Sequence, residues 1–370
     1  MDAGKVFGTL SGLDPTAGWQ MSGFPTPAHL PSRQRPIMLE WIEFKNFKAL
    51  RDTRLPLGRF TLIVGPNGTG KSTALGAVQF FNQFTLGNPA EKRTAGVPSD
   101  ARVILSGQWG SDSNGLQLLL EWSPSSGERN SFRFCGKPDG RLREVFVRAL
   151  KGARSFALDA NEIGKPVELR PDIELAPNGG NLAGVLDRLR DQHPERFAAL
   201  NAELGRWIPE FDQILFDTPD RGHRSIALRT REGGHKIKAT DLSQGTLIAL
   251  ALLTIAYLPT PPSIVCLEEP DHGLHPRLLR EVRDALYRLA FPEDSGEKRE
   301  PVQVIATTHN PYFLDLFREH PEQIVIAEKV GLEGRFTRLS DRKDLEEILG
   351  DAPLSEVWYS GVLGGVPAGT

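Results

Sequence analysis

The chain has 370 residues, of which 39% are hydrophobic and 25% are charged, and its formal net charge is −3. This composition is typical of a folded globular protein with a sizeable core, and the near balance of charge excludes a protein that is basic over its whole surface. The two cysteines, Cys135 and Cys266, are far apart in sequence and have no metal-ligand spacing. They exclude a disulfide framework and fit a reducing compartment.

The sequence contains no stretch that is long and apolar enough to predict a membrane span. The longest apolar run, residues 247–259, is shorter than the roughly 20 residues that a bilayer requires. Residues 1–37 are rich in Gly, Pro, Ser and Thr, so we expect a flexible leader there rather than a secretory signal. We therefore expect a cytoplasmic protein that has no membrane partner.

The first half of the chain predicts mainly strands. Residues 37–50 alternate between apolar and polar side chains, and residues 60–65 form a continuous apolar run typical of a strand buried on both faces. A Gly-rich turn then leads into a helical pattern over 72–84, and a loop is expected over 85–100. Residues 143–150 are a candidate last strand of an antiparallel meander. The other strands of this meander are predicted at 102–109, 116–122 and 131–136.

The second half of the chain predicts strands that alternate with helices. Residues 180–215 have apolar side chains at helical spacing, and Pro194 divides them into two helices. Residues 224–239 predict a hairpin around Gly233 and Gly234. The segments that follow predict helix, strand, helix and strand in turn, at 244–258, 263–269, 276–290 and 302–309. The alternation predicts an α/β fold with a mainly parallel core sheet, an antiparallel β subdomain and an inserted helical lobe.

The most specific motif is GPNGTGKS at residues 65–72, which matches G-x-x-x-x-G-K-[ST] and lies between a predicted strand and a predicted helix. In a P-loop of this kind, backbone N–H groups and the helix N-terminus bind phosphate. We expect Lys71 to reach the β- and γ-phosphates and Ser72 to ligate Mg²⁺; the alternative is a Gly-rich turn that carries Lys-Ser by chance. The predicted ATP-binding residues of this segment are Gly65, Pro66, Asn67, Gly68, Thr69, Gly70, Lys71, Ser72 and Thr73.

Two adjacent glutamates, Glu268 and Glu269, follow the apolar run Ile264 to Leu267. A P-loop enzyme needs one carboxylate at the end of a neighbouring strand to hold the magnesium, and a second group to orient or deprotonate the attacking water. We assign Glu268 to the metal together with Ser72, and Glu269 to catalysis. The alternative is a pair of exposed glutamates that opens a loop.

Two further segments resemble motifs of ABC-type ATPases. DLSQGT at 241–246 resembles the signature segment usually written LSGGQ, and ATTHNP at 306–311 resembles the strand that ends in the switch histidine, here His309. The order of phosphate loop, signature, paired acids and histidine resembles an ABC-type ATPase head of the SMC/RecF/OLD class. EEPDHGLHP and TTHNPYFLDL resemble its stand-alone OLD-like, AAA_21-type prokaryotic branch in particular.

This resemblance implies a P-loop NTPase fold with ATP and Mg²⁺ as cofactors. The implied head spans 38–335 with an inserted helical and hairpin lobe at 136–239, and 336–370 form a C-terminal tail. It implies an ATP-dependent homodimer or higher oligomer and makes His309 a catalytic sensor beside Glu269 and Lys71. The signature residues expected to close on the ATP of another copy are Ser243, Gln244 and Gly245. The sequence departs from the family pattern at Glu268, where Asp is more frequent, and at Gln244, where transporters have Gly.

Several polar residues remain open to more than one interpretation. His272 and His275 have no third ligand at a recognised spacing, which argues against a metal site. The family resemblance implies instead that they belong, with Asp271, to a loop that crosses the dimer interface. Three glutamines are candidates for the residue that senses magnesium and the γ-phosphate, and the sequence does not choose between them. They are Gln79, Gln83 and Gln108.

Two stretches, 141–154 and 221–238, carry several arginines and lysines against one acid each. Either could contact a DNA or RNA backbone, and either could equally be a solvated face. The leading hypothesis is an ATPase that acts as motor or switch for a nuclease-like, nucleic-acid-processing or anti-phage defence effector on another chain. The alternatives are a RecF-like DNA-repair ATPase and a nucleotide-binding regulatory module that does not catalyse hydrolysis.

Overall fold

The computed structural model describes residues 38–83, 92–98, 100–110, 115–123, 130–135, 140–331, 333–350 and 352–364. The chain divides into two units, 1–36 and 37–370, and every described residue belongs to the second. The expected leader at 1–37, half of the expected loop at 85–100 and the last residues of the tail therefore lie outside the described residues. Among the helices that are described, none has the length and apolarity to cross a membrane.

A six-stranded sheet forms the centre of the described unit, in the order β15-β14-β3-β13-β12-β7. Neighbouring strands are parallel except for β14 and β15, which confirms the mainly parallel core sheet. The strands are β3 (Phe60–Val64), β7 (Ala153–Phe156), β12 (Ile264–Glu268), β13 (Gln303–Thr308), β14 (Ile324–Val330) and β15 (Glu333–Arg338).

A second, antiparallel sheet of five strands has the order β2-β1-β4-β5-β6. It confirms the antiparallel subdomain, and β5 alternates buried and half-buried side chains as a strand with one buried face should. Its strands are β1 (Leu39–Phe47), β2 (Leu50–Pro56), β4 (Val103–Trp109), β5 (Leu116–Trp122) and β6 (Asn130–Cys135).

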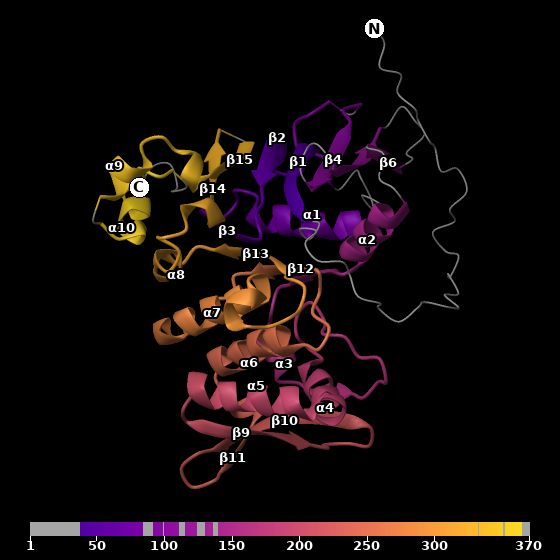
Figure 1. Cartoon of the computed structure of the whole chain (residues 1–370), viewed down its shortest axis with the longest axis vertical. Helices are drawn as coiled ribbons and strands as arrows, with labels where there is room; N and C mark the ends of the chain where they lie inside the picture. The colour runs from indigo at the N-terminus through magenta and orange to yellow at the C-terminus, as the bar shows by residue number, and fades with distance from the viewer. Residues whose placement is uncertain are drawn as a thin grey trace. The chain divides into compact units, whose positions relative to one another are not determined.

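Helix α1 (Lys71–Gln83) lies between the two sheets (Figure 1). Its apolar residues are buried in one cluster with Ile63, Cys266 and Ile305 of the parallel sheet and Leu105 of the antiparallel sheet. Because α1 begins at the phosphate loop, this packing on both faces fixes the position of that loop.

Helix α2 (Gly140–Lys151) replaces the strand expected at 143–150, so that prediction is wrong. Phe146 and Leu150 are both fully buried, and their spacing of four residues places them on one helical stripe. The Phe146 ring packs edge-on against Trp109 and Phe134, at centroid distances of 5.0 and 5.6 Å. Valine and phenylalanine favour strands by propensity, but here the helical spacing of the buried side chains decides the structure.

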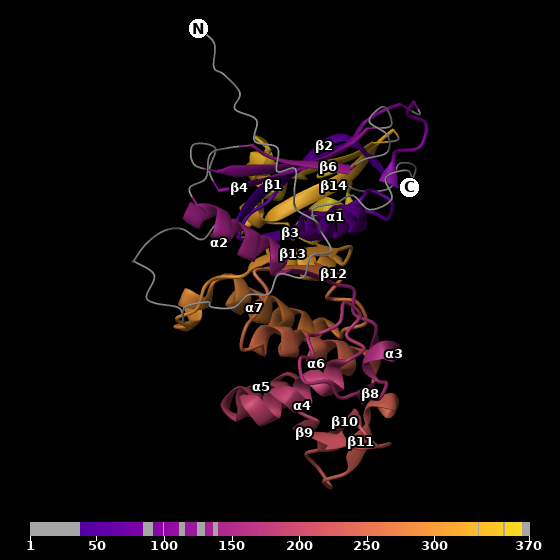
Figure 2. The same cartoon turned by 90° about the vertical axis from the view of Figure 1, so that its right-hand side faces the viewer.

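Helices α6 (Gln244–Tyr257) and α7 (Leu279–Ala290) pack on the opposite face of the parallel sheet. Alternate residues of β3, Phe60, Leu62 and Val64, belong to the apolar cluster on this face, whereas Ile63 faces α1. Figures 1 and 2 both show α6 and α1 on opposite sides of β12 and β13. The short helix α8 (Pro311–Asp315) follows β13.

Between β7 and α6 the chain forms an inserted lobe of helices and a small antiparallel sheet. Its elements are α3 (Ala160–Ile163), β8 (Val167–Glu168), α4 (Leu182–Gln192), α5 (Pro194–Trp207), β9 (Phe211–Asp217), β10 (His223–Thr230) and β11 (Lys236–Lys238). Pro194 opens α5, as expected, and the turn between β10 and β11 has positive φ at Gly233 and Gly234.

Residues 211–215 belong to β9, so the helix expected to extend to 215 is wrong at its end. Pro209 stops the helical hydrogen bonding, and β9 then pairs with β10. Phe211 and Ile214 are both buried, and their spacing of three imitates a helix. The range 136–239 expected for the lobe also contains β7, which pairs with β12 in the core sheet. The expected domain boundaries remain predictions.

The C-terminal part adds α9 (Leu345–Leu349) and α10 (Leu354–Tyr359). The Asp315 carboxylate at the end of α8 accepts hydrogen bonds from the backbone N–H and the hydroxyl of Ser355, at 2.7 and 2.6 Å, and so holds the start of α10. Single 3₁₀ turns complete the chain, at Ala239–Asp241, Pro276–Leu278, Pro292–Ser295, Pro321–Gln323 and Leu339–Asp341.

Candidate nucleotide-binding site

The phosphate loop connects the end of β3 to the start of α1, as its sequence predicts. Gly68 and Gly70 have φ angles of 80° and 99°, in the left-handed region that favours glycine. A Cβ atom on Gly70 would lie 2.6 Å from Cδ2 of Leu50, and one on Gly65 would lie 2.1 Å from the carbonyl oxygen of Ala327. Glycine is therefore required by conformation at Gly68, by close approach at Gly65, and by both at Gly70.

The Lys71 side chain is buried inside this loop, with only 6% of the residue exposed. Its Nζ donates hydrogen bonds to the carbonyl oxygens of Gly65 and Pro66, at 2.7 and 3.0 Å. Burial lowers the pKa of Lys71, and the charges of Glu269 and Glu268 oppose that shift. The ammonium group is thus held among loop carbonyls, where phosphate oxygens could replace them as acceptors.

Ser72 and Glu268 lie in direct contact at the edge of the sheet. The Ser72 hydroxyl, in the first turn of α1, donates a hydrogen bond to the Glu268 carboxylate at the end of β12. A hydroxyl and a carboxylate are oxygen ligands of the kind that Mg²⁺ prefers. The pair therefore fits a magnesium ion.

Glu269 and His309 also lie in contact, because each follows one of two neighbouring parallel strands. Nδ1 of His309 lies 2.8 Å from Oε1 of Glu269, and the Glu269 N–H donates to Thr307 Oγ1 at 3.2 Å. Glu269 has a φ of 45°, which is uncommon for a residue with a side chain and costs on the order of 1 kcal/mol or more. This conformation is supported by the Thr307 hydrogen bond and directs the chain away from β12 just after Glu268.

Asp271 connects the loop after Glu269 to the end of β13. Only 5% of the residue is exposed, and its carboxylate accepts a hydrogen bond from the Thr308 hydroxyl at 3.0 Å. Burial raises the pKa of Asp271. In the same loop, Nδ1 of His275 accepts from the Arg277 N–H at 3.2 Å and caps a 3₁₀ turn. This part of the predicted interface loop is therefore tied to the strand that carries His309.

The signature residues form a second group. Ser243 caps the N-terminus of α6, with its hydroxyl oxygen accepting from the Thr246 N–H at 3.1 Å, and both Ser243 and Gln244 are exposed. A Cβ on Gly245 would lie 2.7 Å from the Gly273 carbonyl oxygen, so the helix start abuts the loop after Glu269. Within the described residues, no hydrogen bond joins this group to the phosphate loop of the same chain.

Other residues that shape the site carry no sequence motif. Ala327 on β14, Leu50 on β2 and Gly334 on β15 press against the phosphate loop, and a Cβ on Gly334 would lie 2.3 Å from the Thr69 carbonyl oxygen. Thr307 supports Glu269, and only its place at the end of a predicted strand could have signalled it. Gln108 is buried and donates to the Gly110 carbonyl at 3.3 Å. The choice among the three candidate glutamines stays open.

Three of the six basic residues in 221–238 form ion pairs with other described residues. Arg224 pairs with Asp187 at 2.9 Å, Arg229 pairs with Asp212 at 2.8 Å, and Lys236 pairs with Asp217. In the other basic stretch, Arg154 pairs with Glu174 at 2.9 Å. The positive charge available to a nucleic-acid backbone is therefore smaller than the sequence indicates.

The parallel sheet, the phosphate loop at its edge and the antiparallel subdomain define the P-loop fold of an ABC-type ATPase head. The family model described as "AAA domain, putative AbiEii toxin, Type IV TA system" matches residues 97–315, and the chain belongs to this family, AAA_21. A model described as "AAA ATPase domain" matches residues 38–110. The chain is thus an ATPase-class protein of the SMC/RecF/OLD type, as the sequence predicted.

One relative is similar in sequence, and two solved structures share the fold. The chain is 24% identical over 336 residues to the OLD nuclease of Thermus scotoductus (strain ATCC 700910 / SA-01), a match that covers 76% of this chain and 60% of that protein. The SMC head domain from Thermotoga maritima aligns with 82% of this chain and 99% of its own, at 18% identity and a TM-score of 0.50. The Smc head domain with a coiled coil and joint from Pyrococcus yayanosii covers 88% and 99%, at 11% identity and a TM-score of 0.54.

Proposed function

We propose that this protein binds ATP with Mg²⁺ at the phosphate loop and hydrolyses it, and that hydrolysis switches its association with a second copy. The observation that carries this proposal is the convergence of two contacts at one edge of the sheet. Ser72 meets Glu268 there, and Glu269 meets His309. Ends of adjacent parallel strands are where open α/β sheets bind ligands.

Each residue has a distinct task in the proposed reaction. Lys71 and the loop N–H groups bind the phosphates, and bound Mg²⁺, held by Ser72 and Glu268, would neutralise charge on the β- and γ-phosphates. Glu269 orients the attacking water and accepts its proton. If His309 carries a proton on both ring nitrogens, Nδ1 donates to Glu269 and holds the carboxylate in place, and Nε2 can donate to the γ-phosphate.

The signature group supports a site that two copies share. Ser243 and Gln244 are exposed at the N-terminus of α6, an end that favours anions. They lie on the opposite face of the sheet from α1, so they are free to meet the γ-phosphate bound by another protomer. A two-fold arrangement would then place two ATP molecules between Lys71 of one copy and Ser243 of the other.

Mixing two inactive variants tests the shared site. Ser243→Arg should block closure and turnover but leave ATP binding intact, whereas Lys71→Ala should remove ATP binding. A mixed dimer has one site with both defects and one site with neither. We expect the mixture to regain activity, up to about half that of an unmodified dimer for each mixed pair, in a phosphate-release assay.

Two control variants distinguish steric blocking of the dimer contact by Ser243→Arg from loss of the N-terminal cap of α6. Ser243→Ala also removes the cap, at a cost of about 1 kcal/mol, but adds no bulk. Ser295→Arg adds an arginine at an exposed serine that belongs neither to α6 nor to the signature segment. Failure of the mixture to recover any activity, together with a monomer in light scattering with ATP, would refute the shared site.

The partner of this switch is proposed to be a nuclease-like effector on another chain, active in nucleic-acid processing or anti-phage defence. The support is the relative named as an OLD nuclease, of which this chain spans 60% of the length. The ion pairs of Arg224, Arg229 and Lys236 favour a protein partner over direct contact with DNA or RNA at that stretch.

A further inference from the structure

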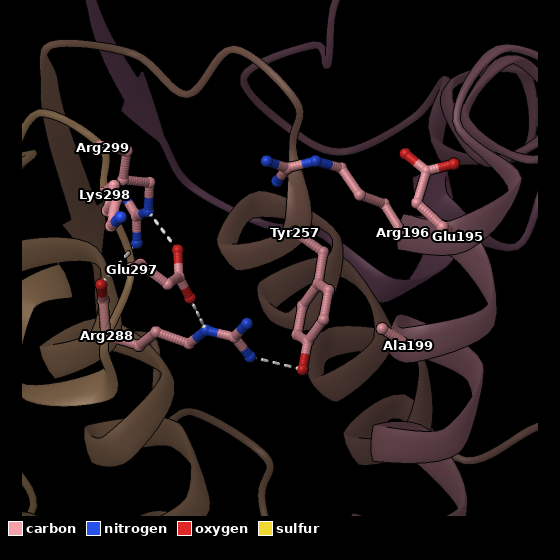
Figure 3. A pocket seen from close by; sticks show the side chains of 8 residues that line it. All are labelled: Glu195, Arg196, Ala199, Tyr257, Arg288, Glu297, Lys298 and Arg299. Carbon is pink, nitrogen blue, oxygen red and sulfur yellow. Dashed lines mark hydrogen bonds and ion pairs between the residues drawn. The ribbon is translucent and has the colours of Figure 1, made fainter.

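A pocket of about 470 Å³ lies between α5, the end of α6, the end of α7 and the segment that follows the 3₁₀ turn at Pro292–Ser295 (Figure 3). Cationic side chains outnumber acidic ones along its wall. The basic residues are Arg196, Arg288, Lys298 and Arg299, and the acidic residues are Glu195 and Glu297. The pocket is built from elements away from the phosphate loop.

Glu297, the acidic residue between Arg288 and Arg299, is hydrogen-bonded to both guanidinium groups. Glu297 accepts a hydrogen bond from Nε of Arg288 and another from Nε of Arg299, the latter at 2.6 Å. Arg288 also donates to the Tyr257 hydroxyl at 2.5 Å, and Arg299 donates to the backbone carbonyl of Arg288. These bonds hold two guanidinium groups and a hydroxyl in fixed positions on the α6 and α7 side of the pocket.

Two further cations in the wall have no acidic partner within the described part of the chain. Arg196 donates only to the Leu258 carbonyl oxygen, at 3.3 Å, and Lys298 is exposed. Figure 3 shows Arg196 on the α5 side and Arg288 on the opposite side, with Tyr257 between them. A ligand in the pocket would therefore meet positive charge from two directions.

We propose that this pocket binds a small polyphosphate anion, free or as part of a phosphorylated metabolite. Guanidinium groups pair with phosphate through charge-assisted hydrogen bonds, and a chain of phosphates offers acceptors to both walls at once. Burial raises the pKa of Tyr257, so its hydroxyl keeps a proton that it can donate to the anion. The volume lies within the usual range of small-molecule sites.

The position of the pocket gives such a ligand a structural effect. It would tie α5 of the inserted lobe to α7 of the head, at the C-terminal end of the helix whose N-terminus carries Ser243. This effect on the signature helix rests on the proposed function, whereas binding of the anion does not.

The test uses inorganic tripolyphosphate and isothermal titration calorimetry on the full chain. Lys71→Ala serves as the background, because it removes the lysine through which the phosphate loop would also bind the probe. We expect one tripolyphosphate per chain in this background. Adding Arg196→Gln and Lys298→Gln should weaken binding at least tenfold, and Lys298→Gln alone, at an exposed position, should weaken it by a smaller factor.

The matched control adds Arg221→Gln and Lys329→Gln, two exposed cations outside the pocket, and should leave binding unchanged. Unchanged melting temperatures would show that the pocket variants fold. Three results would overturn the proposal: no binding in the Lys71→Ala background, binding that survives the pocket substitutions, or equal loss in the control pair. Citrate binding as tightly as tripolyphosphate would overturn the assignment to phosphate. Because no step needs turnover, an inactive ATPase site would not affect the outcome.

Discussion

Glu269→Gln is expected to bind ATP normally and to lose turnover on the order of 10²-fold or more, the usual contribution of a general base. Glutamine keeps nearly the same shape, so contact with His309 can persist, but its amide cannot accept a proton from water. A phosphate-release assay measures the loss, and calorimetry with ATP measures the retained binding. The trapped ATP state should also shift the protein to a dimer or larger species with ATP and not with ADP, in light scattering.

Substitutions at two other glutamates test whether the loss of turnover is specific to Glu269. Glu268→Gln should weaken the magnesium site and therefore ATP binding, because Glu268 lies against Ser72. Glu346→Gln changes an exposed glutamate on α9 and should have no effect. Normal turnover in Glu269→Gln, combined with an ATP-trapped Glu268→Gln protein, would show that the two roles are reversed.

Lys71→Ala is expected to abolish ATP binding and turnover. The substitution removes the buried ammonium group that would contact the phosphates, and it leaves the carbonyl oxygens of Gly65 and Pro66 without that donor. Loss of a charged hydrogen-bonding group from a phosphate site costs roughly 1.5–3 kcal/mol per hydrogen bond. Calorimetry with ATP and magnesium measures the loss, and thermal melting reports any change in stability of the loop.

Lys329→Ala is the matched control, because Lys329 is an exposed lysine on β14. It should bind and hydrolyse ATP like the unmodified protein. If Lys71→Ala and Lys329→Ala had the same ATP affinity and the same rate of ATP hydrolysis, the assignment of ATP binding to residues 65–72 would be wrong.

The core of the fold could be predicted because its signals are local. The continuous apolar runs that became β3 and β12 are short and bounded by turn residues, so a buried strand is the simplest interpretation. The two errors have the opposite cause. At Phe146 and at Phe211, apolar spacing and residue propensity disagree, and packing against distant segments decides between helix and strand.

Some residues of the site could be predicted from local sequence, and others could not. The phosphate loop and the paired glutamates are recognisable because each function occupies consecutive residues. The contact between Glu269 and His309 depends on β12 lying beside β13, which the sequence suggests only through the order of the elements. Thr307, Ala327 and Gly334 carry no signal of their own, because their importance comes from the backbone atoms they touch in three dimensions.

The close contacts around the phosphate loop have a consequence for protein engineering. Leu50, Ala327 and Gly334 come from three different strands, and together they form the surface on which residues 65–70 pack. Grafting GPNGTGKS alone onto another strand–helix junction would transfer the motif without the residues that pack against it. The smallest transplantable nucleotide module of this protein therefore includes the turn at Leu50 and the β14–β15 hairpin, segments that stand before and far beyond the motif in the chain.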